Sequence, residues 1–101
     1  MASRLMLHDE LCKILGSLNV YFQPPENIKL KYPCILYSLS GNDVKHADNT
    51  KYSKVNQYSV TLIDKNPESK FHDKINTLPY CRFDRPYSAD GLNHFKYTLY
   101  Y

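Results

Sequence analysis

Hydrophobic residues recur with helical spacing near the start of the chain. Four of them stand at i, i+4, i+7 and i+8, which places them on one helical face: Leu7, Leu11, Ile14 and Leu15. Ser3 precedes the pattern as a candidate N-cap, and Gly16 follows it where a helix is expected to end. The pattern predicts an amphipathic helix, whose apolar face must be covered by another layer, most simply a sheet.

A second helical pattern follows the middle of the chain. Asn66 is the expected N-cap, Pro67 the first helical residue and Glu68 an acidic residue in the first turn. The expected buried stripe is Phe71, Ile75 and Leu78, and Pro79 is expected to end the helix.

Short apolar runs rich in β-branched and aromatic residues predict strands at residues 19–22, 34–39 and 55–64. The last of these alternates, with Tyr58, Val60 and Leu62 on the side expected to be buried. A closing hairpin is predicted around Asp90-Gly91. In its first strand, Cys81, Phe83 and Arg85 are expected on one face and Arg82 and Asp84 on the other. In its second strand, Phe95, Tyr97 and Leu99 are expected on one face and His94, Lys96 and Thr98 on the other.

Residues 40–54 are polar and allow two interpretations, a disordered loop or the two arms of a long hairpin with its tip near Asp48-Asn49. A structureless loop of this length is unusual in a compact domain, which favours a protruding hairpin. The elements together predict a single α+β domain over residues 1–101. Its sheet is mostly antiparallel, with about four to five strands, two helices packed on one face and a projecting β-hairpin.

Composition narrows the function classes. The chain of 101 residues has 10 Tyr and no Trp, and tyrosine suits half-buried strands and protein interfaces. The net charge of +3 arises from interspersed charges and does not by itself indicate nucleic-acid binding. The cysteines, Cys12, Cys34 and Cys81, are far apart in apolar surroundings, so we expect reduced and mostly buried thiols in a reducing compartment.

Motifs for chemistry are missing. The sequence contains no nucleophile elbow, phosphate-binding loop or metal-ligand spacing, and its four histidines, His8, His46, His72 and His94, fit surface or boundary positions better than ligand roles. We therefore predict no enzymatic activity, no cofactor and no bound metal. No leader segment or membrane-spanning run is evident either.

One binding function competes with a structural one. Basic and aromatic residues are interleaved at residues 29–32, 51–54 and 80–85, a composition that can stack bases and hold phosphates. The element order is also similar to that of a four-stranded RNA-binding sheet, although the motif that marks such sheets is missing. A small single-stranded nucleic-acid-binding module is therefore the alternative from a different class. The same residues suit a protein interface at least as well.

Several motifs together carry a resemblance to a known family. They are Tyr-Pro-Cys-Ile-Leu-Tyr at residues 32–37, Asp-Lys-Asn-Pro-Glu-Ser at 64–69 and Asp-Gly-Leu-Asn-His at 90–94, supported by residues 3–16, 19–25, 78–79, 87–89 and 97–101. With these, nearly the whole chain resembles the tail terminator family of long-tailed phages of Gram-positive bacteria, also called tail completion or head–tail joining proteins.

The resemblance implies a structural virion protein, assembled in the cytoplasm of the bacterial host. Such subunits form a hexameric ring on the head-proximal end of the tail tube, stop tube polymerisation and join the tail to the neck. The implied partners are further copies of the chain, the tail tube protein and a neck or head-completion protein, without a membrane and with DNA only passing through the ring lumen. Another neck, head-closure or minor tail component is the alternative within this class. The candidate assembly interface comprises residues of the projecting hairpin and of the last two strands: Val44, Lys45, His46, Asp48, Asn49, Lys51, Tyr52, Arg82, Arg85, Tyr100 and Tyr101.

Overall fold

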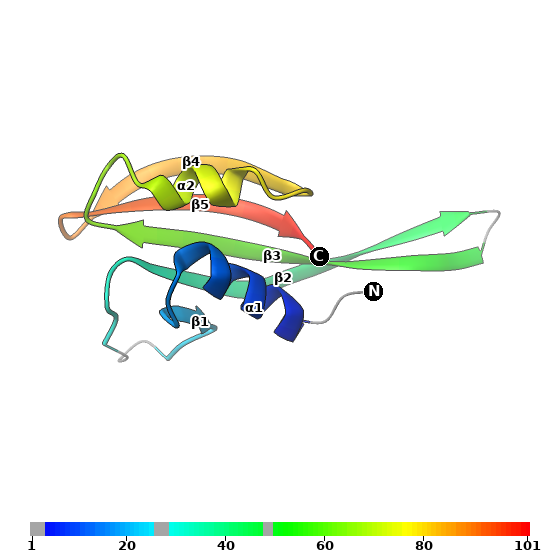
Figure 1. The fold of residues 1–101 in the computed structure, drawn as a ribbon. Helices are drawn as coiled ribbons and strands as arrows, with labels where there is room; N and C mark the ends of the chain where they lie inside the picture. The colour runs from blue at the N-terminus through cyan, green and yellow to red at the C-terminus, as the bar shows by residue number, and fades with distance from the viewer. Residues whose placement is uncertain (1–3, 26–28, 48–49) are drawn as a thin grey trace.

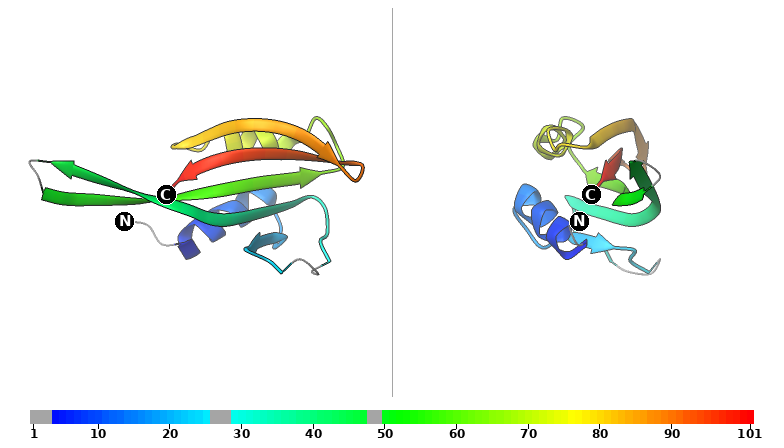
Figure 2. Two further views of the ribbon diagram at one scale, coloured as in Figure 1. Left: turned by 180° about the vertical axis from the view of Figure 1, so that it is seen from behind. Right: turned by 90° about the vertical axis from the view of Figure 1, so that its right-hand side faces the viewer.

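The computed structural model describes residues 4–25, 29–47 and 50–101, which form a five-stranded sheet with two helices on one face (Figures 1 and 2). The strand order is β1-β2-β3-β5-β4, in which β1 and β2 are parallel and the other neighbours antiparallel. The predicted α+β fold is confirmed. The elements are α1 (Arg4–Leu15), β1 (Val20–Phe22), β2 (Cys34–Ala47), β3 (Thr50–Asp64), α2 (Lys70–Asn76), β4 (Cys81–Ala89) and β5 (Leu92–Tyr100).

The core lies between the helices and one face of the sheet. Helix α1 buries Leu7, Leu11 and Leu15, the predicted face apart from Ile14, which is half-buried and packs against the edge of the core. Helix α2 buries Ile75. The sheet contributes alternate residues of its three inner strands: Ile35, Tyr37, Tyr58, Val60, Leu62, Phe95, Tyr97 and Leu99. We call this side of the sheet the helix face and the opposite side the open face.

Each helix is also held to the sheet by a histidine that hydrogen-bonds a buried tyrosine. His8 Nδ1 of α1 lies 2.7 Å from Tyr37 Oη, which also accepts a hydrogen bond from Arg4. His72 Nδ1 of α2 lies 2.5 Å from Tyr97 Oη, and its ring stacks on Phe95. The sequence placed these histidines at a boundary but did not identify their partners.

The second helix differs from its prediction at both ends. It begins at Lys70, with Ser69 as the N-cap accepting a hydrogen bond from the Phe71 amide. Asn66 instead accepts a hydrogen bond from the amide of Glu68, so Asn66, Pro67 and Glu68 form a turn before the helix. The helix ends at Asn76 and so before Pro79, with Leu78 beyond its end but still packed on the core.

The predicted alternation of β4 is wrong after Phe83. The pairing register shifts between Phe83 and Arg85, because Asp84 is the extra residue of a β-bulge. Phe83 pairs with Tyr97 on the helix face, whereas Arg85 pairs with Lys96 on the open face. The bulge thus places Arg85 on the same side of the sheet as Arg82, which pairs with Thr98.

The protruding hairpin is confirmed in its backbone. Strands β2 and β3 pair from Cys34 and Ile63 as far as Ala47 and Thr50, whereas β5 accompanies β3 only as far as Gln57. Beyond that point the two strands extend away from the body (Figure 1). We call residues 42–47 and 50–55 the arm. The predicted tip, Asp48-Asn49, lies outside the described residues, as does the predicted N-cap Ser3.

Candidate functional site

The arm is the most distinctive surface of the molecule. Within the described chain, its two strands pair with each other and with no other strand. An isolated two-stranded ribbon is at best marginally stable in water, because neither side of it is covered. Because the arm extends from the body, the molecule is elongated, with principal extents of 50, 25 and 22 Å.

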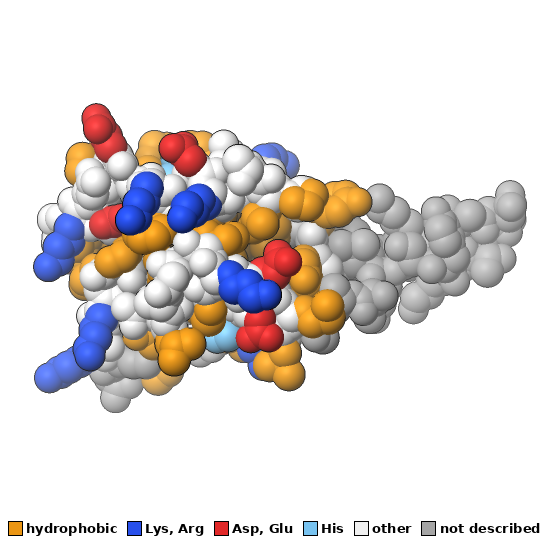
Figure 3. All heavy atoms as spheres, viewed as in Figure 1, with side chains coloured by type: hydrophobic (Ala, Val, Ile, Leu, Met, Phe, Trp, Pro, Cys, Tyr) orange, Lys and Arg blue, Asp and Glu red, His pale blue; other side chains and the backbone are white. Residues whose placement is uncertain are grey.

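Exposed apolar side chains gather where the arm leaves the body. Leu5 and Met6, in the first turn of α1, are 64% and 56% exposed, Leu39 of β2 is 47% exposed, and Tyr80, just before β4, is 77% exposed. The Tyr80 carbonyl accepts a hydrogen bond from the Tyr100 amide, and Leu39 pairs with Tyr58, which in turn pairs with Leu99, the residue before Tyr100. We call these four residues the arm base. Figure 3 shows hydrophobic side chains at the end of the body from which the arm extends.

The open face of the sheet has a hollow of about 190 Å³ with several polar side chains around it. Hydroxyl groups of Ser38, Ser59 and Thr61 lie along the middle strands, with Lys96 and Tyr87 to one side. Lys96 lies directly opposite Arg85, so two like charges are adjacent across the β4–β5 pair. Within the described part of the chain, neither of these two cations forms an ion pair.

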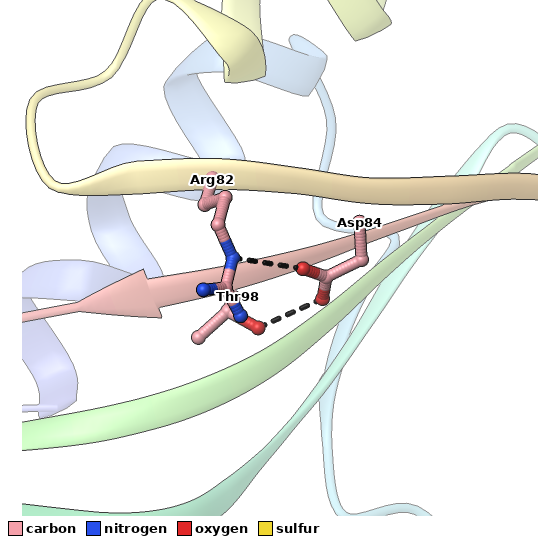
Figure 4. A network of polar contacts seen from close by, with 3 residues as sticks. All are labelled: Arg82, Asp84 and Thr98. Carbon is pink, nitrogen blue, oxygen red and sulfur yellow. Dashed lines mark hydrogen bonds and ion pairs between the residues drawn. The ribbon is translucent and has the colours of Figure 1, made fainter.

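A polar network holds the bulge in β4 beside these cations (Figure 4). Asp84 Oδ1 lies 3.1 Å from Arg82 Nε, and Thr98 donates a hydrogen bond of 2.8 Å to Asp84 Oδ2. Asp84 therefore pairs with Arg82 and leaves Arg85 without an acidic partner among the described side chains. Arg85 lies over the ring of Tyr87, and that ring also stacks on His94 with ring centroids 4.6 Å apart.

The structure distributes the predicted interface residues over three places. Five of them belong to the arm, where the structure describes the backbone but not the side chains: Val44, Lys45, His46, Lys51 and Tyr52. Asp48 and Asn49 lie outside the described residues. Tyr100 and Tyr101 lie near the arm base, where the Tyr101 amide donates to the Asn56 carbonyl. Arg82 and Arg85 lie on the open face.

The sequence-based prediction missed several residues of these surfaces. Lys96 was part of a predicted alternating strand, and the alternation already placed it on the face opposite Phe95 and Tyr97. Its pairing with Arg85 depends on the bulge, which no motif signalled. The four residues of the arm base were missed because they come from three separate segments.

The cysteines are free thiols, of which Cys34 is fully buried and Cys12 and Cys81 are half-buried. Burial raises the pKa of Cys34 and of Cys81 to about 11, and it also raises the pKa of Cys12. Protonated thiols are poor nucleophiles and ligands. No three His, Cys, Asp or Glu side chains gather as potential metal ligands in the described part of the chain. None of its helices is long and apolar enough to cross a bilayer.

These raised pKa values predict a loss of stability in alkali. As pH rises above 9, the unfolded chain releases the Cys34 proton while the folded protein retains it until about pH 11, so stability present below pH 9 is lost in this window. At pH 10.5 the loss from Cys34 is about 2 kcal/mol. Urea unfolding under reducing conditions at pH 8 and 10.5 measures it. Cys34→Ala is expected to show a smaller difference between the two pH values than the wild type, and equal differences would contradict the assignment to Cys34.

Comparison with protein-family models and with curated protein sequences finds no match for this chain.

Proposed function

We propose that the protein is a structural subunit of a tailed phage that assembles with copies of itself into a ring at the head-proximal end of the tail, where it ends tube growth and joins the tail to the neck. The observation that carries the proposal is the arm, a two-stranded ribbon that extends from the body beside a group of exposed apolar residues.

The geometry suits a head-to-tail contact. The arm and the body are different surfaces, so an arm that lies on a neighbour's body makes a heterologous interface. Such an interface gives a closed ring when its rotation closes and a filament when it does not. In this arrangement the arm base, with Leu5, Leu39 and Tyr80, is covered at each contact. A closed ring has no free end to which further copies can add.

The mass of the assembled protein tests the proposal. We expect size-exclusion chromatography with light scattering to give a closed oligomer, either for the protein alone or after addition of purified tail tubes. The double variant Leu5→Ser/Tyr80→Ser removes apolar area from the arm base and is expected to weaken assembly at least tenfold. Leu18→Ser is a control, since Leu18 is 85% exposed and follows the C-terminal end of α1, whereas Leu5 lies in its first turn.

Two results would contradict the proposal in whole or in part. A protein that remains monomeric with and without tubes would overturn the proposal. Equal weakening by the control would show that general surface polarity governs assembly, and would remove the arm base from the interface.

A further inference from the structure

We propose that the open face of the sheet binds single-stranded nucleic acid, with phosphate groups held by Arg85 and Lys96 and a base stacked on Tyr87. This activity goes beyond the proposed ring and does not require it. Positive charge, hydroxyl groups and an exposed aromatic ring occur together on this surface.

The first observation is the pair of like charges. Arg85 and Lys96 face each other across β4 and β5, and like charges directly opposite each other destabilise a sheet. The one described carboxylate on this face, Asp84, pairs with Arg82. The other acidic side chains that the structure describes belong to helices, turns and strand ends: Asp9, Glu10, Asp64, Glu68, Asp73 and Asp90. The uncompensated positive charge therefore faces outward from the open side of the sheet and would be relieved by an anionic ligand.

The second observation is the set of hydroxyl groups beside this charge. Ser38, Ser59 and Thr61 line the hollow next to Lys96. Serine and threonine hydroxyls, together with arginine and lysine, are the side chains that commonly contact the phosphate and sugar of a nucleic acid. An acidic protein partner would account for the cations but would make no particular use of these small hydroxyl groups.

The third observation favours a strand whose bases are exposed. Tyr87 is 40% exposed, and its ring stacks on that of His94 with the two planes at 19°. Arg85 also lies over the tyrosine ring, with its guanidinium carbon 5.8 Å from the centroid, so a base that stacks on Tyr87 takes the place of this guanidinium and leaves it to hold a phosphate. Aromatic rings on an open sheet, flanked by basic residues, provide stacking platforms for unpaired bases.

Fluorescence anisotropy with a labelled 15-residue oligothymidylate, titrated with the full-length protein between 25 and 200 mM salt, tests the inference. We expect binding at low salt that weakens as salt rises, because bound phosphates release counterions. The variant Arg85→Gln/Lys96→Gln is expected to bind at least tenfold more weakly and to lower the log–log salt slope by about 1.4, that is ~0.7 for each lost phosphate contact. The control Lys13→Gln/Lys74→Gln removes the same charge from exposed positions on the two helices and is expected to retain most of the affinity.

Variants of Tyr87 distinguish the contribution of base stacking from that of phosphate binding. Tyr87→Ala is expected to weaken binding severalfold without changing the salt slope, whereas Tyr87→Phe retains the affinity because it retains the ring. The inference is overturned if the oligonucleotide does not bind at 25 mM salt, if the two double variants lose affinity equally, or if a polyglutamate peptide binds and the oligonucleotide does not. Light scattering of the single variant Lys96→Gln, at a residue outside the candidate assembly interface, is expected to give the wild-type mass, so failure here and failure of the ring are distinguishable.

Discussion

Removal of the arm is expected to abolish assembly while leaving the monomer folded. Asp43 and Val55 face each other in the β2–β3 pairing, so Asn-Gly in place of residues 44–54 joins them by a two-residue hairpin turn. Residues 44–54 lie beyond Gln57, the last residue of β3 that pairs with β5. The free energy of unfolding should therefore change by no more than about 0.5 kcal/mol, as for substitutions away from buried contacts.

Two measurements on the shortened protein decide the outcome. Urea unfolding reports the stability of the monomer, and light scattering with and without tail tubes reports assembly. An unfolded product would show that the arm contributes to the core. A folded product that still forms wild-type oligomers would show that the arm is not part of the interface. As a matched control, the Asp90-Gly91 turn at the other end of the sheet can be replaced by Asn-Gly, which should affect neither measurement.

The fold was largely predictable because, in most segments, the apolar residues recur with the period of a helix or a strand and polar residues fill the positions between them. Leu7, Leu11 and Leu15 fix the buried side of α1, and Tyr58, Val60 and Leu62 fix that of β3. The alternation of residues 94–99 likewise assigned the two faces of β5 correctly. In each segment one set of residues is apolar and the other polar, so turning the segment by one face would bury polar side chains.

The errors occur where local side-chain hydrogen bonds determine the backbone. Asn66 and Ser69 are both good N-cap residues, and the sequence alone favoured Asn66 because proline follows it. In the structure Asn66 closes a turn and Ser69 caps the helix. The bulge at Asp84 likewise depends on contacts with Arg82 and Thr98, and Thr98 is fourteen residues away along the chain.

The candidate surfaces were less predictable than the fold because each combines distant segments. The arm was visible as a polar stretch flanked by strands, but the arm base joins the first turn of α1 to residues before β4. The Arg85–Lys96 pair requires both the strand order and the bulge. Neither surface follows from a local pattern.

The largest loss of stability from a single substitution is expected at Tyr97. Its side chain is fully buried between α2 and the sheet, contacting the rings of His72 and Phe83. Tyr97→Ala removes a large aromatic side chain from a packed core and should cost about 3–5 kcal/mol. For a domain whose total stability is in the usual range of about 5–15 kcal/mol, this loss would leave the protein close to its unfolding threshold.

Tyr97→Phe separates the hydroxyl from the ring. It keeps the packing but removes the hydrogen bond to His72 Nδ1, leaving a half-buried ring nitrogen without that partner, and should cost about 1–2 kcal/mol. Tyr80→Ala is the control, because Tyr80 is 77% exposed and its loss should change monomer stability by no more than about 0.5 kcal/mol. Urea unfolding of the three variants measures these differences. If Tyr97→Phe is as stable as the wild type, the hydrogen bond contributes nothing to the docking of α2, and helix attachment depends on the stacking of His72 against Phe95 and on burial of Ile75.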